Sequence, residues 1–302
     1  MPTYVVVGAG PVGRAAAALL AESGHAVTLV SRSGTVLAGG RVASCALDAS
    51  DGPLLSAVVR GAHAVLMCAM APYDRWRSEF PPIMAGVVAA ARANGVRIVV
   101  LGNIYAYGAG SPATLTPDLP LRPTSDKGRV RQAMWQQALD AGVPVLEVRA
   151  SDYLGAGAAS PFTLLTLPAL LAGNPALVLG DPDISHPWTF TLDVARTLAA
   201  AVAYEGEWGR AFHVPSQHVP VRQLARHFTA AAGLPPGTLL PLSDAELAER
   251  GREDPIMNEL LEMAYLYRTA NVLAAKETED LLKIHASSLD TMVRHTLAAL
   301  SP

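Results

Sequence analysis

Residues Tyr4 to Arg14 read YVVVGAGPVGR, and this stretch decides the fold. Four residues suited to a buried strand run into Gly8, Gly10 and Gly13, and an alanine-rich helix follows. The order predicts a strand, a tight turn and a helix that begins at Arg14. In such a turn the first glycine permits the bend, the second lets the backbone approach a pyrophosphate, and the third lets helix and strand pack closely.

The neighbours of this turn make the motif more specific than its glycine spacing alone. An apolar helix runs from Ala15 to Ala21, and a second strand-forming run follows at Ala26 to Val30. The unpaired N–H groups at the start of a helix attract phosphate. The sequence therefore predicts a dinucleotide site, and the alternative is a glycine-rich turn that binds nothing. The residues expected to contact the dinucleotide here are Gly8, Gly10, Pro11, Val12 and Gly13.

Composition limits the class of protein. With 302 residues, of which 51% are hydrophobic, the chain can form one large α/β domain or a nucleotide domain with a smaller partner. A formal charge of −3 provides no basic surface for nucleic acid. Cys45 and Cys68 both fall in predicted strands as small buried thiols, so we expect neither a disulfide framework nor a metal cluster. A reducing, cytoplasmic location fits this cysteine usage.

The longest uncharged stretch, Tyr153 to Gly180, raises the question of a membrane span. Pro161, Pro168 and Pro175 would break a spanning helix, so we expect no membrane segment and instead a buried loop and a helix over 161–173. The amino terminus has no basic region or cleavage site of a secretory signal. The eight histidines show no metal-ligand spacing, so no metal is predicted.

Strands and helices alternate over the first half of the chain. This alternation is typical of a parallel doubly wound sheet, whose ligand lies beyond the carboxyl ends of its strands. We therefore predict an α/β protein with a Rossmann-type sheet and a smaller carboxyl-terminal α/β substrate domain. The predicted nucleotide domain covers 1–160, with a return of the chain at 190–214, and the predicted substrate domain covers 161–302. The further strands expected in the sheet are 41–47, 62–68, 96–101 and 143–148, with helices at 50–60, 73–94 and 126–141.

The residues after the second strand select the nucleotide. An acidic residue there binds the ribose 2′-hydroxyl of NAD, whereas an arginine meets the 2′-phosphate of NADP. This chain has Ser31 and Arg32, which favours NADP over NAD, with Arg14 as a second phosphate partner. The alternative is that Arg32 is a solvated loop cation.

Two residues beyond later strands are further candidates for contact with the cofactor. Asp48 follows the third strand and lies either beside the adenine or at the start of the 50–60 helix as its cap. Ala69 belongs to a loop of small residues after the fourth strand, and such a loop can lie against a cofactor.

Several segments together resemble the extended or atypical short-chain dehydrogenase/reductases, the group called NAD-dependent epimerase/dehydratases. They are the glycine turn, the Tyr107-Gly108 pair after the fifth strand, the Arg149-Ala-Ser-Asp-Tyr153 strand end and the Thr191-Leu-Asp-Val-Ala195 segment. The resemblance implies a nucleotide-binding domain with a small substrate domain. It also implies a Ser/Thr, Tyr and Lys set that acts on an alcohol or ketone, with tyrosine as the acid/base.

This chain departs from that set at all three positions. Asn103 stands at the Ser/Thr position, Lys127 at the tyrosine position and Arg131 at the lysine position. No tyrosine between Tyr107 and Tyr153 restores the motif in another register. The family's usual proton relay is therefore absent.

The substitutes define the candidate catalytic residues. The Asn103 amide can donate a hydrogen bond to a carbonyl oxygen. Burial beside Arg131 would lower the pKa of Lys127 toward the range of an acid/base. The favoured alternative is that Lys127 and Arg131 form a ribose and phosphate clamp or a solvated first turn. The other candidate proton donors are three tyrosines at strand ends: Tyr105, Tyr107 and Tyr153. For each of them the alternative is a packing or hydrogen-bonding role.

The resemblance also implies that His186 and Trp188, in the segment before Asp193, line the substrate pocket, and Tyr153 is a third candidate for the pocket. The alternative for His186 is a loop histidine bonded to backbone. The expected function is NADP-dependent oxidoreduction of a small-molecule carbonyl, alcohol or sugar-like substrate, with epimerase or dehydratase chemistry second. The alternative is a regulatory or scaffold protein that binds NADP without catalysis. The resemblance also allows a homodimer that pairs the 73–94 and 126–141 helices.

Overall fold

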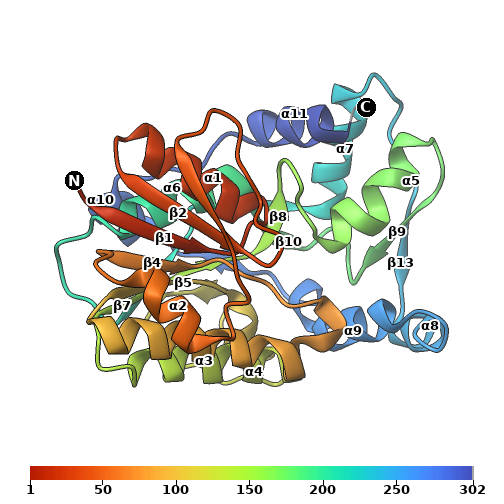
Figure 1. Ribbon diagram of the computed structural model, residues 1–302. Helices are drawn as coiled ribbons and strands as arrows, with labels where there is room; N and C mark the ends of the chain where they lie inside the picture. Colours follow the sequence, from red (N-terminus) through yellow and green to blue (C-terminus); the bar gives the residue numbers. More distant parts are fainter. Residues whose placement is uncertain (301–302) are drawn as a thin grey trace.

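A seven-stranded parallel sheet forms the centre of the computed structural model, which describes residues 1–300 (Figure 1). Its strand order is β11-β7-β5-β4-β1-β2-β3. The predicted doubly wound α/β fold is thus confirmed. The order reverses between β1 and β4, and the crevice at such a point is where open parallel sheets bind ligands. The strands are β1 (Thr3–Val7), β2 (Ala26–Ser31), β3 (Val42–Ala46), β4 (Ala64–Met67), β5 (Arg97–Asn103), β7 (Val145–Ala150) and β11 (Arg210–His213).

Helices cover both faces of this sheet, which explains why its strands are apolar almost throughout. In β1 the side chains of Tyr4 and Val6 enter the core under α1 (Pro11–Glu22) and α6 (Thr191–Ala201). Val5 and Val7 enter the opposite core. The helices over that second core are α2 (Gly52–Val59), α3 (Trp76–Asn94) and α4 (Asp126–Leu139).

The rest of the chain forms three smaller sheets around a separate apolar core that contains Phe162, Trp188 and Phe228. One sheet has the order β12-β10-β8, and the others pair β13 with β9 and β14 with β6. The division of the chain into domains at residue 160 stays a prediction. These strands are β6 (Thr114–Leu115), β8 (Asp152–Leu154), β9 (Ala176–Leu179), β10 (Ser185–Phe190), β12 (Gln217–Pro220), β13 (Leu239–Leu242) and β14 (Val272–Leu273).

Most helices of this second part lie on the side of the molecule away from the amino terminus, whereas α10 lies near it (Figure 1). They are α5 (Leu167–Leu171), α7 (Val221–Ala231), α8 (Asp244–Arg250), α9 (Pro255–Met263), α10 (Lys276–Leu282) and α11 (Leu289–Leu300). Short 3-10 turns cover Tyr73–Arg75, Ile104–Tyr107 and Ala264–Tyr267.

Several local expectations were wrong. The first helix begins at Pro11, because proline at the first helical position loses no needed hydrogen bond. The helix expected over 161–173 is present over 161–171, but its first part is a π turn, Phe162–Thr166, ahead of the short α5, because Pro168 has no N–H to continue an α-helical ladder. Asp51, not Asp48, caps α2.

The two cysteines differ in burial. Cys68 is buried just after β4, whereas Cys45 in β3 is only half-buried, because β3 is the edge strand of the sheet. Within residues 1–300 no helix has both the length and the apolar character needed to cross a membrane. The same residues contain no group of three or more histidine, cysteine, aspartate or glutamate side chains placed to hold a metal ion.

Candidate active site

Two glycines of the turn are required by close packing. Gly8 has a φ of 109°, and its N–H donates to the carbonyl of Val30 at 2.8 Å. A Cβ at Gly8 would lie 2.4 Å from the backbone nitrogen of Ala69, and one at Gly13 would lie 2.0 Å from the carbonyl oxygen of Gly8. Side chains at either position would therefore push the turn away from β4 or from its own helix.

Gly10, unlike Gly8 and Gly13, is not packed against other atoms. A Cβ at this position would meet no atom within 4 Å, and its φ of −70° is open to any residue. It caps α1 without a side-chain bond, so the first N–H groups of that helix have no partner within it. Gly10 lines two cavities of the described residues. The open space above it is where a pyrophosphate would lie.

The first cavity, of about 740 Å³, extends from the glycine turn along the ends of β2, β3 and β4. Ser31, Arg32, Asp48 and Ala69 all line it, and their contact with a cofactor stays a prediction. Arg32 forms no ion pair within residues 1–300. Arg14 is exposed on α1 and lines neither cavity.

Asp48 is held in place by its neighbour. One of its carboxylate oxygens, Oδ1, accepts bonds from the N–H and the hydroxyl of Ser50, at 2.9 and 2.8 Å. These bonds lower the pKa of Asp48. The carboxylate therefore stays ionised at the cavity wall.

The second cavity, of about 550 Å³, is mostly apolar and is built by both parts of the chain. Leu101 and Asn103 reach it from β5, and Trp76 from the start of α3. The opposite walls are formed by Leu164 of the π turn and Leu260 of α9. Residues far apart in the sequence thus meet at one end of the sheet.

Asn103 and Tyr105 lie together at the end of β5, and both line the second cavity. The side-chain oxygen of Asn103 accepts the N–H of Tyr105 at 3.2 Å. No other residue in the described part of the chain binds the Asn103 amide nitrogen. That nitrogen is a donor available to a ligand.

The tyrosines of the cavity retain their protons. The hydroxyl groups of Tyr73 and Tyr105 lie 3.5 Å apart, and Tyr153 is on the same cavity wall. Burial raises the pKa of all three. They are therefore hydrogen-bond donors at neutral pH.

Tyr107 lies outside both cavities, contrary to its prediction as a candidate near the cofactor. Its hydroxyl is 2.6 Å from Nε2 of His213 and accepts a bond from Arg149 at 2.7 Å. Burial raises the pKa of Tyr107 to about 12. The short turn after β5 directs this ring into the interior, where it joins β11 to β7.

Lys127 at the start of α4 also lines neither cavity. Its ammonium group forms ion pairs with Glu259 and, at 3.0 Å, with Glu262, and it lies 4.4 Å from the centre of the Tyr73 ring. Its backbone N–H also donates to Glu262 at 2.9 Å. With 4% of the side chain exposed, Lys127 is not part of a solvated turn. It connects α4 to α9 instead.

Arg131, one helical turn later, does line the second cavity. Its guanidinium lies over the rings of Trp76 and Phe80, at 4.7 and 4.6 Å from their centres, and these two rings contact each other edge to face. It donates to the carbonyl of Leu101 at 2.9 Å and pairs with no carboxylate within residues 1–300. Burial lowers its pKa, but an arginine keeps its charge.

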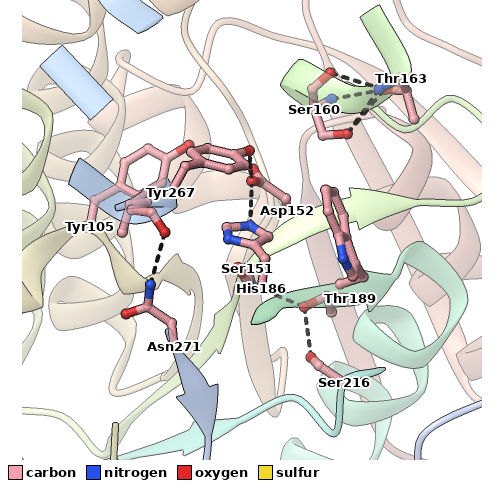
Figure 2. A network of polar contacts seen from close by, with 12 residues as sticks. Tyr105, Ser151, Asp152, Ser160, Thr163, His186, Thr189, Ser216, Tyr267 and Asn271 are labelled. Atoms are coloured by element: carbon pink, nitrogen blue, oxygen red, sulfur yellow. Dashed lines mark hydrogen bonds and ion pairs between the residues drawn. The ribbon is translucent and has the colours of Figure 1, made fainter. Parts of the chain in front are cut away.

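A buried polar network lies behind the cavity (Figure 2). Asp152 lines the cavity, and its Oδ2 accepts a bond from Tyr267 and lies 2.8 Å from Nε2 of His186. The imidazole of His186 is stacked on the Tyr267 ring with 4.3 Å between the ring centres. The sequence analysis used Asp152 only as part of a family segment. Its position two residues beyond the end of β7, and three residues after Arg149, was the signal for a functional role.

His186 and Trp188 do not line the second cavity, contrary to the prediction. Both lie in β10, the central strand of the three-stranded sheet, and are buried. The indole N–H of Trp188 donates to the carbonyl of Val219 at 3.0 Å. The pairing of β10 with β8 places Asp152, rather than these two residues, at the cavity wall.

Residues 4–214 match the model of the NAD dependent epimerase/dehydratase family. The chain belongs to this family of enzymes. The resemblance found in the sequence is thereby confirmed. A search of curated proteins returns no match.

Solved structures share the fold over the full length. The enzyme WbmH of Bordetella bronchiseptica, in complex with NAD+, has a TM-score of 0.79 at 20% identity, with 99% of this chain and 98% of that chain covered. The UDP-glucuronic acid 4-epimerase of Bacillus cereus, in complex with NAD, gives 0.77 at 16% identity, and the UDP-glucose 4-epimerase of Thermotoga maritima, with UDP-glucose, gives 0.78 at 15%; both comparisons cover 99% and 98% of the two chains.

Proposed function

We propose that the protein is an NADP-dependent oxidoreductase that acts on a small-molecule carbonyl, alcohol or sugar-like substrate. The observation that carries this proposal is the place of Gly10, which lies on both cavities at the start of α1. A dinucleotide in the first cavity would therefore end at the second. The first cavity would hold the adenosine and the pyrophosphate, and the second would hold the substrate.

The residues present fit a nicotinamide dinucleotide. Gly10 leaves room for the pyrophosphate beside free N–H groups, and Asp48 and Ala69 line the adenosine side. The choice of NADP depends on Arg32, which lacks an ion pair within residues 1–300 and lines the same cavity. Two of the solved relatives named above were determined with NAD bound, so the preference for a 2′-phosphate depends on Arg32 alone.

The chemistry in the second cavity would follow from its lining. The nicotinamide, when bound, supplies or accepts a hydride. The free amide nitrogen of Asn103 and the protonated hydroxyl of Tyr105 would donate hydrogen bonds to a substrate oxygen. The apolar walls would exclude water, and the Arg131 charge over the two rings would favour an electron-rich group nearby.

Steady-state reduction of benzaldehyde, acetophenone and a series of aliphatic ketones and ketoses by NADPH tests this function. Turnover of any member supports it. As a control, Arg41→Ala changes an exposed arginine outside both cavities and should turn over the same substrates at the wild-type rate. NADPH binding without any turnover favours the regulatory or scaffold alternative, which is supported by the engagement of Lys127 in ion pairs.

Pairing of two copies through α3 and α4 stays a prediction, which sedimentation measurements would test.

A further inference from the structure

The second cavity contains few groups that can accept a proton at neutral pH. Burial raises the pKa of the Cys68 thiol and of the three tyrosines described above, so each retains its proton. Arg131 has no acceptor atom. Asp254 caps α9 by accepting the N–H of Ile256 at 2.9 Å and is exposed. Asp152 is the remaining carboxylate among the lining residues.

The two oxygens of Asp152 have different surroundings. Oδ2 receives both bonds of the network, from Tyr267 and from His186. No residue in the described part of the chain binds Oδ1. Since Asp152 lines the cavity with 9% of its side chain exposed, Oδ1 is its atom available to a ligand.

The network also fixes the charge of this site. The Nδ1 atom of His186 is buried and has no hydrogen-bond partner. A doubly protonated ring would leave an unpaired N–H there, which is costly in a buried site. We therefore assign a neutral His186 with its proton on Nε2, directed at Asp152. The negative charge of Asp152 is oriented by two donors and is not cancelled by a cation.

We propose that Oδ1 of Asp152 is the proton acceptor and donor of the reaction, in place of the family's missing tyrosine. This inference depends on the proposed function. In alcohol oxidation the substrate O–H bond breaks and its proton passes to Oδ1, while the hydride leaves carbon for the oxidised nicotinamide dinucleotide, which is the oxidant. The carbon–oxygen double bond forms and the Asp152 carboxyl is left neutral. Carbonyl reduction reverses every transfer. Asp152 is then a catalytic residue, and His186 and Tyr267 are positioning residues.

Asp152→Asn tests this role, because asparagine has the same shape but cannot take up the proton. We expect turnover of the carbonyl panel to fall at least about a hundredfold, with the dissociation constant of NADPH unchanged within twofold. Asp152→Glu should recover part of the loss. Asp183→Asn removes an exposed carboxylate that pairs with Arg222 outside both cavities, and it should retain full turnover. Turnover within threefold of the wild type in Asp152→Asn would overturn the role.

A second measurement needs no cofactor. In the ¹⁵N spectrum of the histidine rings we expect His186 to carry a proton on Nε2 and none on Nδ1, and Asp152→Asn should shift the Nε2 proton upfield as the charge-assisted bond is lost. A doubly protonated His186, or an unchanged resonance, would overturn the network. Failure to bind NADPH would remove the proposed function and the proton step together, whereas unchanged turnover in Asp152→Asn would remove the proton step alone.

Discussion

The two cavities that meet at Gly10 are built in different ways. Every residue that lines the first lies between Val7 and Ile83, in one continuous run of the parallel sheet and its loops. The second is lined by residues from Gly10 to Leu260, and α9 forms one of its walls. The first cavity is thus completed by local strand and loop order, whereas the second depends on how the second part of the chain is held against the sheet.

Lys127→Met should lower the free energy of unfolding more than any other substitution discussed below, and it should loosen α9, which forms one wall of the second cavity. The substitution leaves Glu259 and Glu262 of α9, whose side chains are 24% and 23% exposed, beside a buried apolar group. Because water partly solvates these two charges, the expected cost is about 2 to 3 kcal/mol, below that of breaking a fully buried pair. Chemical denaturation measures this loss, and limited proteolysis should locate it at α9. The affinity for NADPH should stay within a few fold, because Lys127 lines neither cavity.

Arg129→Met provides the matched control on the same helical turn. Arg129 is exposed and pairs with Asp126, and such surface pairs contribute at most about 1 kcal/mol. A loss of less than 1 kcal/mol for Lys127→Met as well would contradict the anchoring of α9. A complete loss of turnover in a variant of unchanged stability would restore Lys127 as the acid/base.

Acid should weaken the large sheet through His213, which lies in β11 and belongs to neither cavity. Burial lowers its pKa to about 3, from an ordinary value near 6.5. The unfolded chain then binds a proton that the folded chain excludes, so the stability is present above pH 6.5 and is lost as the pH falls from there toward 3. Between pH 7 and pH 5 the loss is about 2 kcal/mol.

The difference between the wild type and His213→Gln isolates this contribution in denaturation curves taken from pH 7 to pH 5. The variant should lose less stability over this range, because the group that excludes the proton is gone. Equal losses in the two proteins would show that other groups cause the acid sensitivity.

Arg32→Ala should have the smallest effect and should act on the first cavity alone. Arg32 is exposed, so the loss of its contact with a 2′-phosphate should cost about 1 kcal/mol, or about fivefold in NADPH affinity. NADH affinity should not change. Calorimetric titration of both nucleotides measures the two values, and equal losses would contradict the preference for NADP.

The sequence predicted local features of the molecule well, and contacts between distant segments poorly. The role of Arg32 stays a prediction, whereas the glycine turn and the strand alternation were placed correctly, because each depends on residues a few positions apart. The roles of Lys127, His186 and Trp188 were not, because the carboxylates that bind Lys127 lie more than 130 positions later. The wall that contains Asp152 exists only once β8 pairs with β10, and strands this short give little signal in the sequence.

The central claim is that Gly10 joins a dinucleotide site to the second cavity, and titration of NADPH into the wild type and Gly10→Ala by calorimetry tests it most directly. Alanine suits the backbone of Gly10, and its methyl group would meet only open space, so the variant should fold with unchanged stability. We predict that the wild type binds NADPH at one site and that Gly10→Ala binds it more than about tenfold more weakly, a loss above about 1.4 kcal/mol. Equal affinity in the two proteins, or no binding by the wild type, would contradict the account.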